Sequence, residues 1–230
     1  MQSPRYAIYW APEPETALAH FGAGVLGLDG TRLRPGFIPA SEWFAITETP
    51  MRYGFHGTLK APFRLAEGQT EETLLAALEA FAAQRAPVAM PTLSIGPMGS
   101  FIAFHASGND GPLSPFAFEI VRHFDQFRAV LSPEEVIRRD PDRLSVAQRE
   151  NLIFYGYPYV SGEFRFHLTL TDSIADERMR GLITDWLRDT AEAAGVAIPV
   201  HLQSLSLFRQ LSGGEPFEEI ARFPLKGAFS

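Results

Sequence analysis

The sequence predicts an α+β fold in which two similar lobes, each an antiparallel sheet with flanking helices, surround a central cleft. Strand-like and helix-like segments follow one another in the same order in the two halves of the 230-residue chain. Residues 55–59 match 166–170 at an offset of 111, and 93–95 match 205–207 at an offset of 112, as an internal duplication would leave them. A composition of 46% hydrophobic and 20% charged residues, with 19 Phe, supplies a core and excludes collagen-like, coiled-coil and wholly disordered chains.

The repeat divides the chain into three parts within a single bilobal domain that spans residues 1–230. We expect the first lobe at residues 1–106 and the second at 163–230. Residues 107–162 have no counterpart in the repeat and are expected to form a helical connector. A chain of this length is long enough for each lobe, at roughly 100 residues, to bury a core.

In the first lobe, aromatic or alternating runs predict strands, and a 3.6-residue periodicity of apolar residues predicts helices. The clearest helix follows Thr70, an N-cap candidate with Glu71 and Glu72 in the first turn. Residues 41–49 alternate weakly and lead through Pro50 into a strand. The expected elements are a strand at 6–10, a helix at 15–26, a strand at 53–62, the helix after Thr70, and a hairpin of 88–95 with 100–105.

The connector and the second lobe follow the same rules. Ser132 and Glu135 match a capping box, which predicts the start of a helix in the connector, and residues 140–151 are charged and expected to be helical. The remaining expected elements are a helix at 116–130, a strand at 164–171, a helix at 176–194, and a strand pair of 200–208 with 218–223. The arginines expected to be mostly solvated are Arg138, Arg139, Arg143 and Arg149.

The charge balance favours a small anionic ligand over a long nucleic acid. The chain has 20 Lys and Arg against 27 Asp and Glu, a formal net charge of −7. Such a protein repels a phosphate backbone at long range, so extended nucleic-acid binding would need a local basic patch. A small phosphorylated ligand needs only a few well-placed cations.

The absence of cysteine removes several classes of chemistry. No disulfide framework, thiolate nucleophile or Cys-ligated metal site can form. The N-terminal apolar run is too short for a signal peptide, and no run of about 18 apolar residues occurs. We therefore expect a soluble, cytoplasmic protein with no membrane partner.

The repeated motif gathers polar side chains on one face of a strand in each lobe, because residues two apart in a strand point the same way. The apolar residues between them face a core. The polar faces carry His56, Thr58 and Lys60 in the first copy, and Arg165, His167 and Thr169 in the second.

These side chains suit a phosphate ester if the two polar faces confront each other. Two imidazoles with an ordinary pKa near 6.5 can act as general base and general acid on opposite sides of a phosphorus atom. Threonine hydroxyls can donate to the non-bridging oxygens, and Lys60 and Arg165 can offset the charge of the transition state. No cofactor or metal is required, and neither His-x-His nor His-Glu-x-x-His occurs.

The strings His56-Gly57-Thr58-Leu59 and His167-Leu168-Thr169-Leu170 resemble the paired motifs of the two-histidine (2H) phosphoesterase superfamily. Its members include cyclic nucleotide phosphodiesterases and the so-called RNA 2′,5′-ligases. Residues 53–65 and 164–171 are similar to one bacterial branch that is encoded in phosphonate-utilisation operons. The resemblance covers essentially the whole chain, and two such motifs in equivalent positions of a repeat are a strong signal.

The resemblance implies a cyclic phosphodiesterase-like phosphoric diester hydrolase. It implies His56 and His167 as the catalytic acid and base, and Thr58 and Thr169 as phosphate ligands. Substrate contacts of Lys60 and Arg165 are inferred only from the alternation of side chains along a strand. We expect hydrolysis of a small cyclic phosphate or phosphodiester, by analogy a sugar cyclic phosphate from phosphonate breakdown. The histidines expected to be ordinary core or surface residues are His20, His105, His123 and His201.

Two other functions stay open. The same residues would suit hydrolysis or ligation of RNA ends that carry a 2′,3′-cyclic phosphate, provided that a basic track leads from the cleft. The cleft would also suit a non-catalytic protein that binds a phosphorylated metabolite and signals to a partner. Turnover on cyclic phosphates separates an enzyme from such a sensor.

Overall fold

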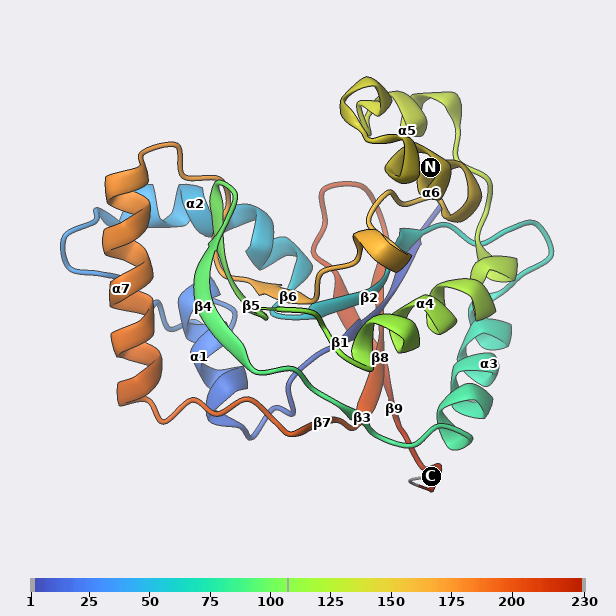
Figure 1. The fold of residues 1–230 in the computed structure, drawn as a ribbon, viewed down its shortest axis with the longest axis horizontal. Coiled ribbons are helices and arrows are strands. Elements are labelled where there is room, and N and C mark those ends of the chain that lie inside the picture. Colours follow the sequence, from blue (N-terminus) through green and yellow to red (C-terminus); the bar gives the residue numbers. More distant parts are fainter. Residues whose placement is uncertain (1–2, 107, 229–230) are drawn as a thin grey trace.

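A computed structural model describes residues 3–106 and 108–228, and its centre is a seven-stranded antiparallel sheet (Figure 1). The strand order is β4-β5-β6-β2-β1-β8-β9. The strands span Arg5–Trp10 (β1), Gly57–Phe63 (β2), Leu93–Met98 (β4), Phe101–Ala106 (β5), His167–Thr169 (β6), Ser204–Gln210 (β8) and Glu218–Pro224 (β9). A second, two-stranded sheet pairs β3 (Val88–Ala89) with β7 (His201–Leu202).

Strands from the two halves of the chain interleave in the large sheet. β6, from the second half, lies between β5 and β2, and β1, from the first half, lies between β2 and β8. The α+β class is confirmed, but the expectation of one sheet in each lobe differs from the structure, in which one sheet runs through the molecule. The sequence patterns locate the strands, whereas two of their pairings, β2 with β6 and β1 with β8, join residues more than 100 positions apart.

Helices pack on this sheet near its two ends and on its middle strand (Figure 1). α7 packs on β4 and β5, α3 packs on β8 and β9, and α4 packs on β2. None of the helices in the described part of the chain is long and apolar enough to cross a membrane. The helices span Ala17–Leu26 (α1), Ala40–Tyr53 (α2), Glu71–Ala83 (α3), Leu113–His123 (α4), Pro133–Ile137 (α5), Val146–Tyr155 (α6) and Glu177–Ala193 (α7).

Helix caps account for several of these boundaries. Thr70 accepts a hydrogen bond from the Thr73 amide at the start of α3, and Ser132 and Glu135 form a capping box at α5. Both caps confirm the sequence prediction. The connector contains α4, α5 and α6, and its last two helices project from the body of the molecule (Figure 1).

The segment before β2 is helical, which corrects the weak alternation seen in residues 41–49. Its buried residues in α2 are Trp43, Thr47 and Pro50, a spacing of four and three that fits one face of a helix. The N–H of Trp43 bonds to the carbonyl of Pro39, and its indole Nε1 donates to the carbonyl of Val25 in α1. The helical spacing of the buried residues matches the structure, whereas the alternation of polar and apolar residues extends over too few positions to predict a strand.

β2 contains a bulge that decides which of its side chains face the site. Tyr9 of β1 lies opposite Thr58, whereas the neighbouring Ile8 lies opposite Lys60, so Leu59 is an extra residue in β2. Thr58 therefore shares the face of Tyr9, and Lys60 shares the face of Ile8, which is fully buried in the core. Strand alternation is interrupted within the motif.

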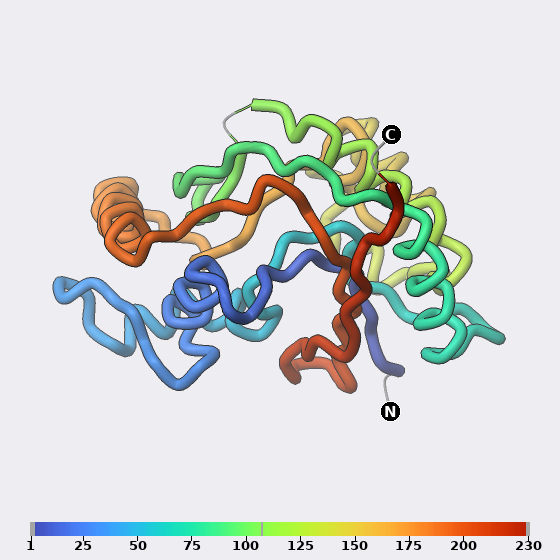
Figure 2. Tube along the Cα trace, turned by 90° about the horizontal axis from the view of Figure 1, so that it is seen from below, coloured from blue at the N-terminus to red at the C-terminus, as the bar shows by residue number. Residues whose placement is uncertain are grey.

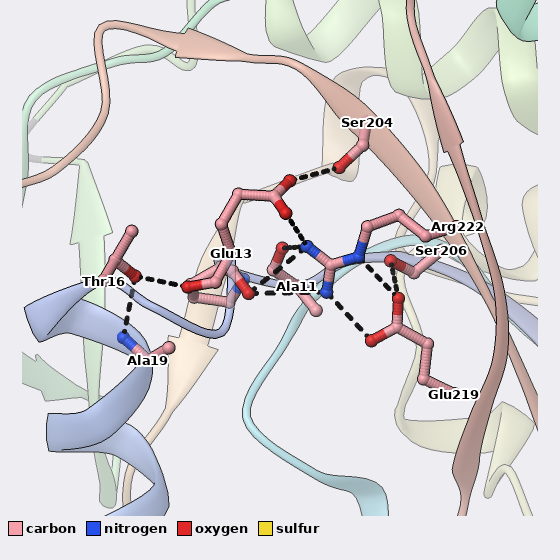
Figure 3. A network of polar contacts seen from close by, with 9 residues as sticks. Ala11, Glu13, Thr16, Ala19, Ser204, Ser206, Glu219 and Arg222 are labelled. Atoms are coloured by element: carbon pink, nitrogen blue, oxygen red, sulfur yellow. Dashed lines mark hydrogen bonds and ion pairs between the residues drawn. The ribbon is translucent and has the colours of Figure 1, made fainter.

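An arginine in the edge strand β9 holds the segment that follows β1 (Figure 3). The guanidinium of Arg222 in β9 lies 2.8 Å from a carboxylate oxygen of Glu13 and 2.7 Å from one of Glu219. It also donates to the carbonyls of Ala11 and Pro12. Five donors in a rigid fork suit this arrangement, which holds the chain just after the strand that carries Tyr9.

Figure 2 shows the same molecule from below, with the β1 strand passing through the middle of the body. The core is continuous: Ile8, Phe166 and Leu168 are buried in one cluster with residues of α1, α3, α4 and α7. A second, small cluster of Ala7, Tyr9, Ala11, Phe208 and Phe217 lies on the other face of β1 and β8.

Candidate active site

Four polar side chains gather on one face of the sheet where β2 and β6 meet. One pair between the two motifs, Gly57 with Leu168, sets the register of these antiparallel strands. Side chains on either side of this pair point to the opposite face. The residues that then lie across from each other are His56 and Thr169, and Thr58 and His167. Cross-strand neighbours of this kind have Cβ atoms about 5 Å apart.

Both imidazoles are held in the same way. Nδ1 of His56 lies 2.9 Å from the carbonyl oxygen of Gly54, and Nδ1 of His167 lies 2.8 Å from that of Arg165. Because a carbonyl only accepts, each Nδ1 carries the hydrogen, and each Nε2 keeps a lone pair. Nε2 of His56 lies 3.2 Å from the Thr58 hydroxyl. The two rings are therefore oriented for proton transfer at Nε2.

The histidines line two adjoining compartments of one cleft. The larger compartment, about 540 Å³, is lined by His56 and Thr169, and the smaller, about 390 Å³, by His167. Thr58, Ala61 and Tyr157 line both, so the compartments meet along the side chains of β2. The cleft is large enough for a sugar phosphate or a nucleotide.

Tyr9 forms the base on which His56 rests. The two rings are stacked, with centroids 3.6 Å apart and planes 17° apart. Tyr9 is 1% exposed and also lines the larger compartment. Tyr6, three residues earlier, points away and donates from its hydroxyl to Glu71. Because the two tyrosines are three residues apart in a strand, their side chains point to opposite faces. The side chain of Tyr9 is the one that lines the cleft.

Lys60 lies outside the cleft, which corrects the prediction that it shares a face with His56. Its ammonium donates to the carbonyl of Val121 at 3.1 Å and lies 3.4 Å from Asp125, and the side chain is buried against α4. The physical reason is the bulge at Leu59, because one extra residue reverses the faces to which the following side chains of β2 point. Burial lowers the pKa of Lys60 to about 8, and the nearby Asp125 offsets part of this effect.

Arg165 lines the smaller compartment beside His167. One of its guanidinium nitrogens donates to the backbone carbonyls of Gly162 and Phe164, at 3.1 and 2.6 Å. The rest of this exposed side chain is free to meet a ligand. A substrate contact from Arg165 stays a prediction.

The larger compartment contains more positive charge than the sequence indicated. Arg138 and Arg139 both line it. Arg138, Arg143 and Arg149 are exposed as predicted, whereas Arg139 is only partly exposed. The sequence places these residues just after α5 but does not show that this helix lies over the cleft. The other arginines that line this compartment are Arg5, Arg64 and Arg128.

Residues 58–218 match the model of a protein family described as "Protein of unknown function (DUF1045)". The match spans well over half of the chain and includes most of the site. The chain belongs to the DUF1045 family. His56 lies just before the matched range, and His167 lies within it.

This DUF1045 chain is also similar to two curated proteins named "Ribose 1,5-bisphosphate phosphokinase PhnN". The protein from Janthinobacterium sp. (strain Marseille) is 34% identical over 97% of this chain and 51% of its own length. The protein from Laribacter hongkongensis (strain HLHK9) is 30% identical over 93% of this chain and 50% of its own length. The chain thus spans about half the length of the curated relatives that it matches.

Among solved structures, the DUF1045 chain is similar to the protein TT0787 of Thermus thermophilus, with a TM-score of 0.47 and 15% identity over 98% of this chain and 100% of that one. It is also similar to LigT of E. coli, whose crystal structure is complexed with 3′-AMP. That similarity has a TM-score of 0.42 and 11% identity over 97% of this chain and 99% of that one.

Burial sets the charge state of the two histidines. It lowers the pKa of His56 to about 4, against the smaller opposing effect of the Gly54 carbonyl, and His167 lowers it further. Burial also lowers the pKa of His167, with His105, its neighbour across β5 and β6, acting in the same direction.

The low pKa of His56 predicts that stability falls in mild acid. Below pH 6.5 the unfolded chain protonates this imidazole, whereas the folded protein keeps it neutral down to about pH 4. Unfolding then takes up a proton, so the contribution of His56 is present above pH 6.5 and is lost as the pH falls toward 4, by at most about 3 kcal/mol.

Urea unfolding at pH 7 and pH 4.5 measures this loss. His56→Gln, which does not titrate, is expected to lose less stability between the two pH values than the wild type. His20→Gln changes an exposed histidine outside the cleft and serves as the control. The same pH dependence in His56→Gln and the wild type would contradict the assignment.

Proposed function

We propose that this protein is a phosphoesterase that hydrolyses a small cyclic phosphate by two-histidine acid and base catalysis. The observation that carries the proposal is the placement of His56 and His167, with Thr58 and Thr169 between them, on one face of the sheet in one cleft. Both Nε2 atoms are left available by the carbonyls that hold Nδ1. Among the residues described, no group of three or more acidic or histidine side chains is placed to hold a metal ion.

The low pKa of His56 suits it to be the general base. Its neutral Nε2 takes a proton from water as the water oxygen attacks phosphorus, and the ester bond on the far side breaks. Nε2–H of protonated His167 gives its proton to the departing alkoxide oxygen. The hydroxyls of Thr58 and Thr169 donate to the non-bridging oxygens, which carry most charge in the transition state. The product is a phosphate monoester with one new hydroxyl.

A sugar cyclic phosphate is the substrate class that the surroundings favour. The curated relatives are named for an enzyme of a ribose bisphosphate, and the resembled branch suggests a role in phosphonate breakdown. We do not assign the kinase reaction to this chain, because its 230 residues contain no Gly-Lys followed by Ser or Thr of the kind that holds nucleoside triphosphates.

Turnover of a panel of cyclic phosphates tests the proposal. Glycerol, ribose and nucleoside cyclic phosphates are incubated with the protein in EDTA, and phosphorus NMR follows the monoester product. We expect turnover in EDTA, with kcat/KM passing through a maximum on the acidic side of pH 6.5, because burial lowers the pKa of both histidines. Binding without product would contradict the proposal and favour a phosphometabolite sensor. Loss of turnover in EDTA would contradict it in favour of a metal-dependent enzyme.

A further inference from the structure

Four arginines from distant parts of the chain surround the larger compartment. They come from the first residue of β1, from the end of β2, and from the segment after α5. We call them the arginine cluster: Arg5, Arg64, Arg138 and Arg139. Arg5 precedes Tyr9 by four residues of β1, roughly 13 Å of extended strand, so Arg5 lies away from the ring that supports His56.

The arginine cluster contains more positive charge than its surroundings offset. Arg64 forms an ion pair with Glu135, and Arg138 lies 4.0 Å from the same carboxylate. Arg5 donates to the neutral amide of Gln210. Burial lowers the pKa of Arg64, and the charges of Arg5 and Arg138 lower it further, which places these guanidinium groups within repulsive range of one another.

The other charged residues that line the compartment are already paired. Arg128 lies 2.7 Å from Asp125 and donates to the Phe154 carbonyl. The carboxylate of Asp172 accepts the backbone N–H of Thr49. The five arginines that line the compartment still outnumber its two carboxylates, Glu135 and Asp172, and of these arginines Asp125 neutralises only Arg128.

Arg139, like Arg5, has no anionic partner among the described residues. Its guanidinium lies over the ring of Tyr157, 5.1 Å from the centroid, and no carboxylate of the described residues lies within ion-pair distance. The side chain is only partly exposed, and burial lowers its pKa. A half-buried charge without a counterion raises the free energy of the folded protein, so an anionic ligand would stabilise it. The ring of Tyr157 holds the Arg139 guanidinium in a position to bind such an anion.

We propose that the arginine cluster binds a phosphate monoester on the substrate, at a distance from the cyclic phosphate that the histidines cleave. This inference rests on the proposed function. A monoester has a charge between about −1.5 and −2 at pH 7 and three acceptor oxygens, which matches several guanidinium groups better than a carboxylate does. The substrate class is then a sugar that carries a cyclic phosphate and a second, terminal phosphate.

Binding of ribose 5-phosphate, measured by calorimetry against ribose, tests the subsite without any chemistry. We expect the wild type to bind the phosphate and not the free sugar, with an affinity that weakens at high salt. Arg139→Gln is expected to lose about 10- to 100-fold in affinity, as removal of a charged hydrogen bond does. Arg138→Gln changes a largely exposed side chain, so it tests the same loss without threatening the fold.

Arg143→Gln is the matched control. It removes the same charge from the same segment, but Arg143 is 87% exposed, pairs with Asp140 and does not line the compartment. Its affinity is expected to equal that of the wild type. If Arg139→Gln and Arg143→Gln lose affinity equally, the loss reflects only the net charge of the protein, and the proposed subsite is overturned.

Turnover separates failure of the subsite from failure of the proposed function. The substrates are uridine 2′,3′-cyclic phosphate, its 5′-phosphorylated form, and a uridine dinucleotide ending in the same cyclic phosphate. We expect kcat/KM to be at least 10-fold higher for the 5′-monoester than for the other two, and this ratio to fall in Arg139→Gln.

Equal turnover of all three substrates would overturn the subsite and leave the phosphoesterase intact. A preference for the dinucleotide would overturn it in favour of RNA ends. Tight binding of ribose 5-phosphate with no turnover of any substrate would support the subsite and contradict the proposed hydrolysis.

Discussion

Replacing either His56 or His167 by alanine is expected to lower kcat/KM for a cyclic phosphate by about 10²- to 10⁴-fold. Each imidazole transfers a proton at Nε2 in the proposed mechanism, and general acid or base catalysis by a positioned side chain contributes this much. Both rings are held by backbone carbonyls that remain in the variants. Steady-state kinetics on the best substrate of the panel measure the effect.

The double variant sharpens the test. If the two histidines act in one step, His56→Ala combined with His167→Ala loses little more than either single variant, because the pair works as a unit. His20→Ala, at an exposed position outside the cleft, is the control and is expected to retain full activity. Full activity in His56→Ala would show that the cleft has another chemistry.

Gly57→Ala is expected to destabilise the protein by about 1 to 3 kcal/mol and to disturb the site. A Cβ at this position would lie 2.3 Å from Cζ and 2.4 Å from Cε2 of Phe166, whose ring is 1% exposed. The ring cannot move away cheaply, because it is packed in the core beside Trp10. Gly57 also separates His56 from Thr58, so any shift of the strand changes both.

Urea unfolding measures the loss, and two further variants identify its cause. Gly57→Ala combined with Phe166→Leu, which shortens the opposing side chain, is expected to lose less stability than the sum of the single changes. Gly181→Ala, in the exposed part of α7 with open space around it, is the control and is expected to be stabilising by about 0.5 to 1 kcal/mol. An unchanged stability in Gly57→Ala would show that Phe166 moves freely.

Most elements of the fold could be predicted from local patterns. The strand at 6–10 is β1, the helix after Thr70 is α3, and the capping box at Ser132 starts α5. These features depend on alternation and capping, which act over a few residues. The order of the strands could not be predicted, because pairs such as β1 with β8 join residues about 200 positions apart.

The site shows the same division between local and distant information. The repeated motif predicted the side chains that meet at Gly57 and Leu168, because alternation is intact on both strands there. Lys60 was misplaced because one bulged residue, Leu59, reverses alternation without any mark in the sequence. Arg139 was missed because a charged residue after a short helix looks solvated until the position of that helix is known.

The place of β1 between β2 and β8 has a consequence for the synthesis of the protein. β1 is translated well before β8 and β9, and Tyr9 lies in a strand that borders β8 along its length. Until residues 204–210 leave the ribosome, β1 has one open edge, and Tyr9, which stacks on His56, lacks Phe208 of β8 as a neighbour. We therefore expect His56 to gain its full support only after β8 has been translated, and a chain that stops before residue 204 to lack both this support and activity.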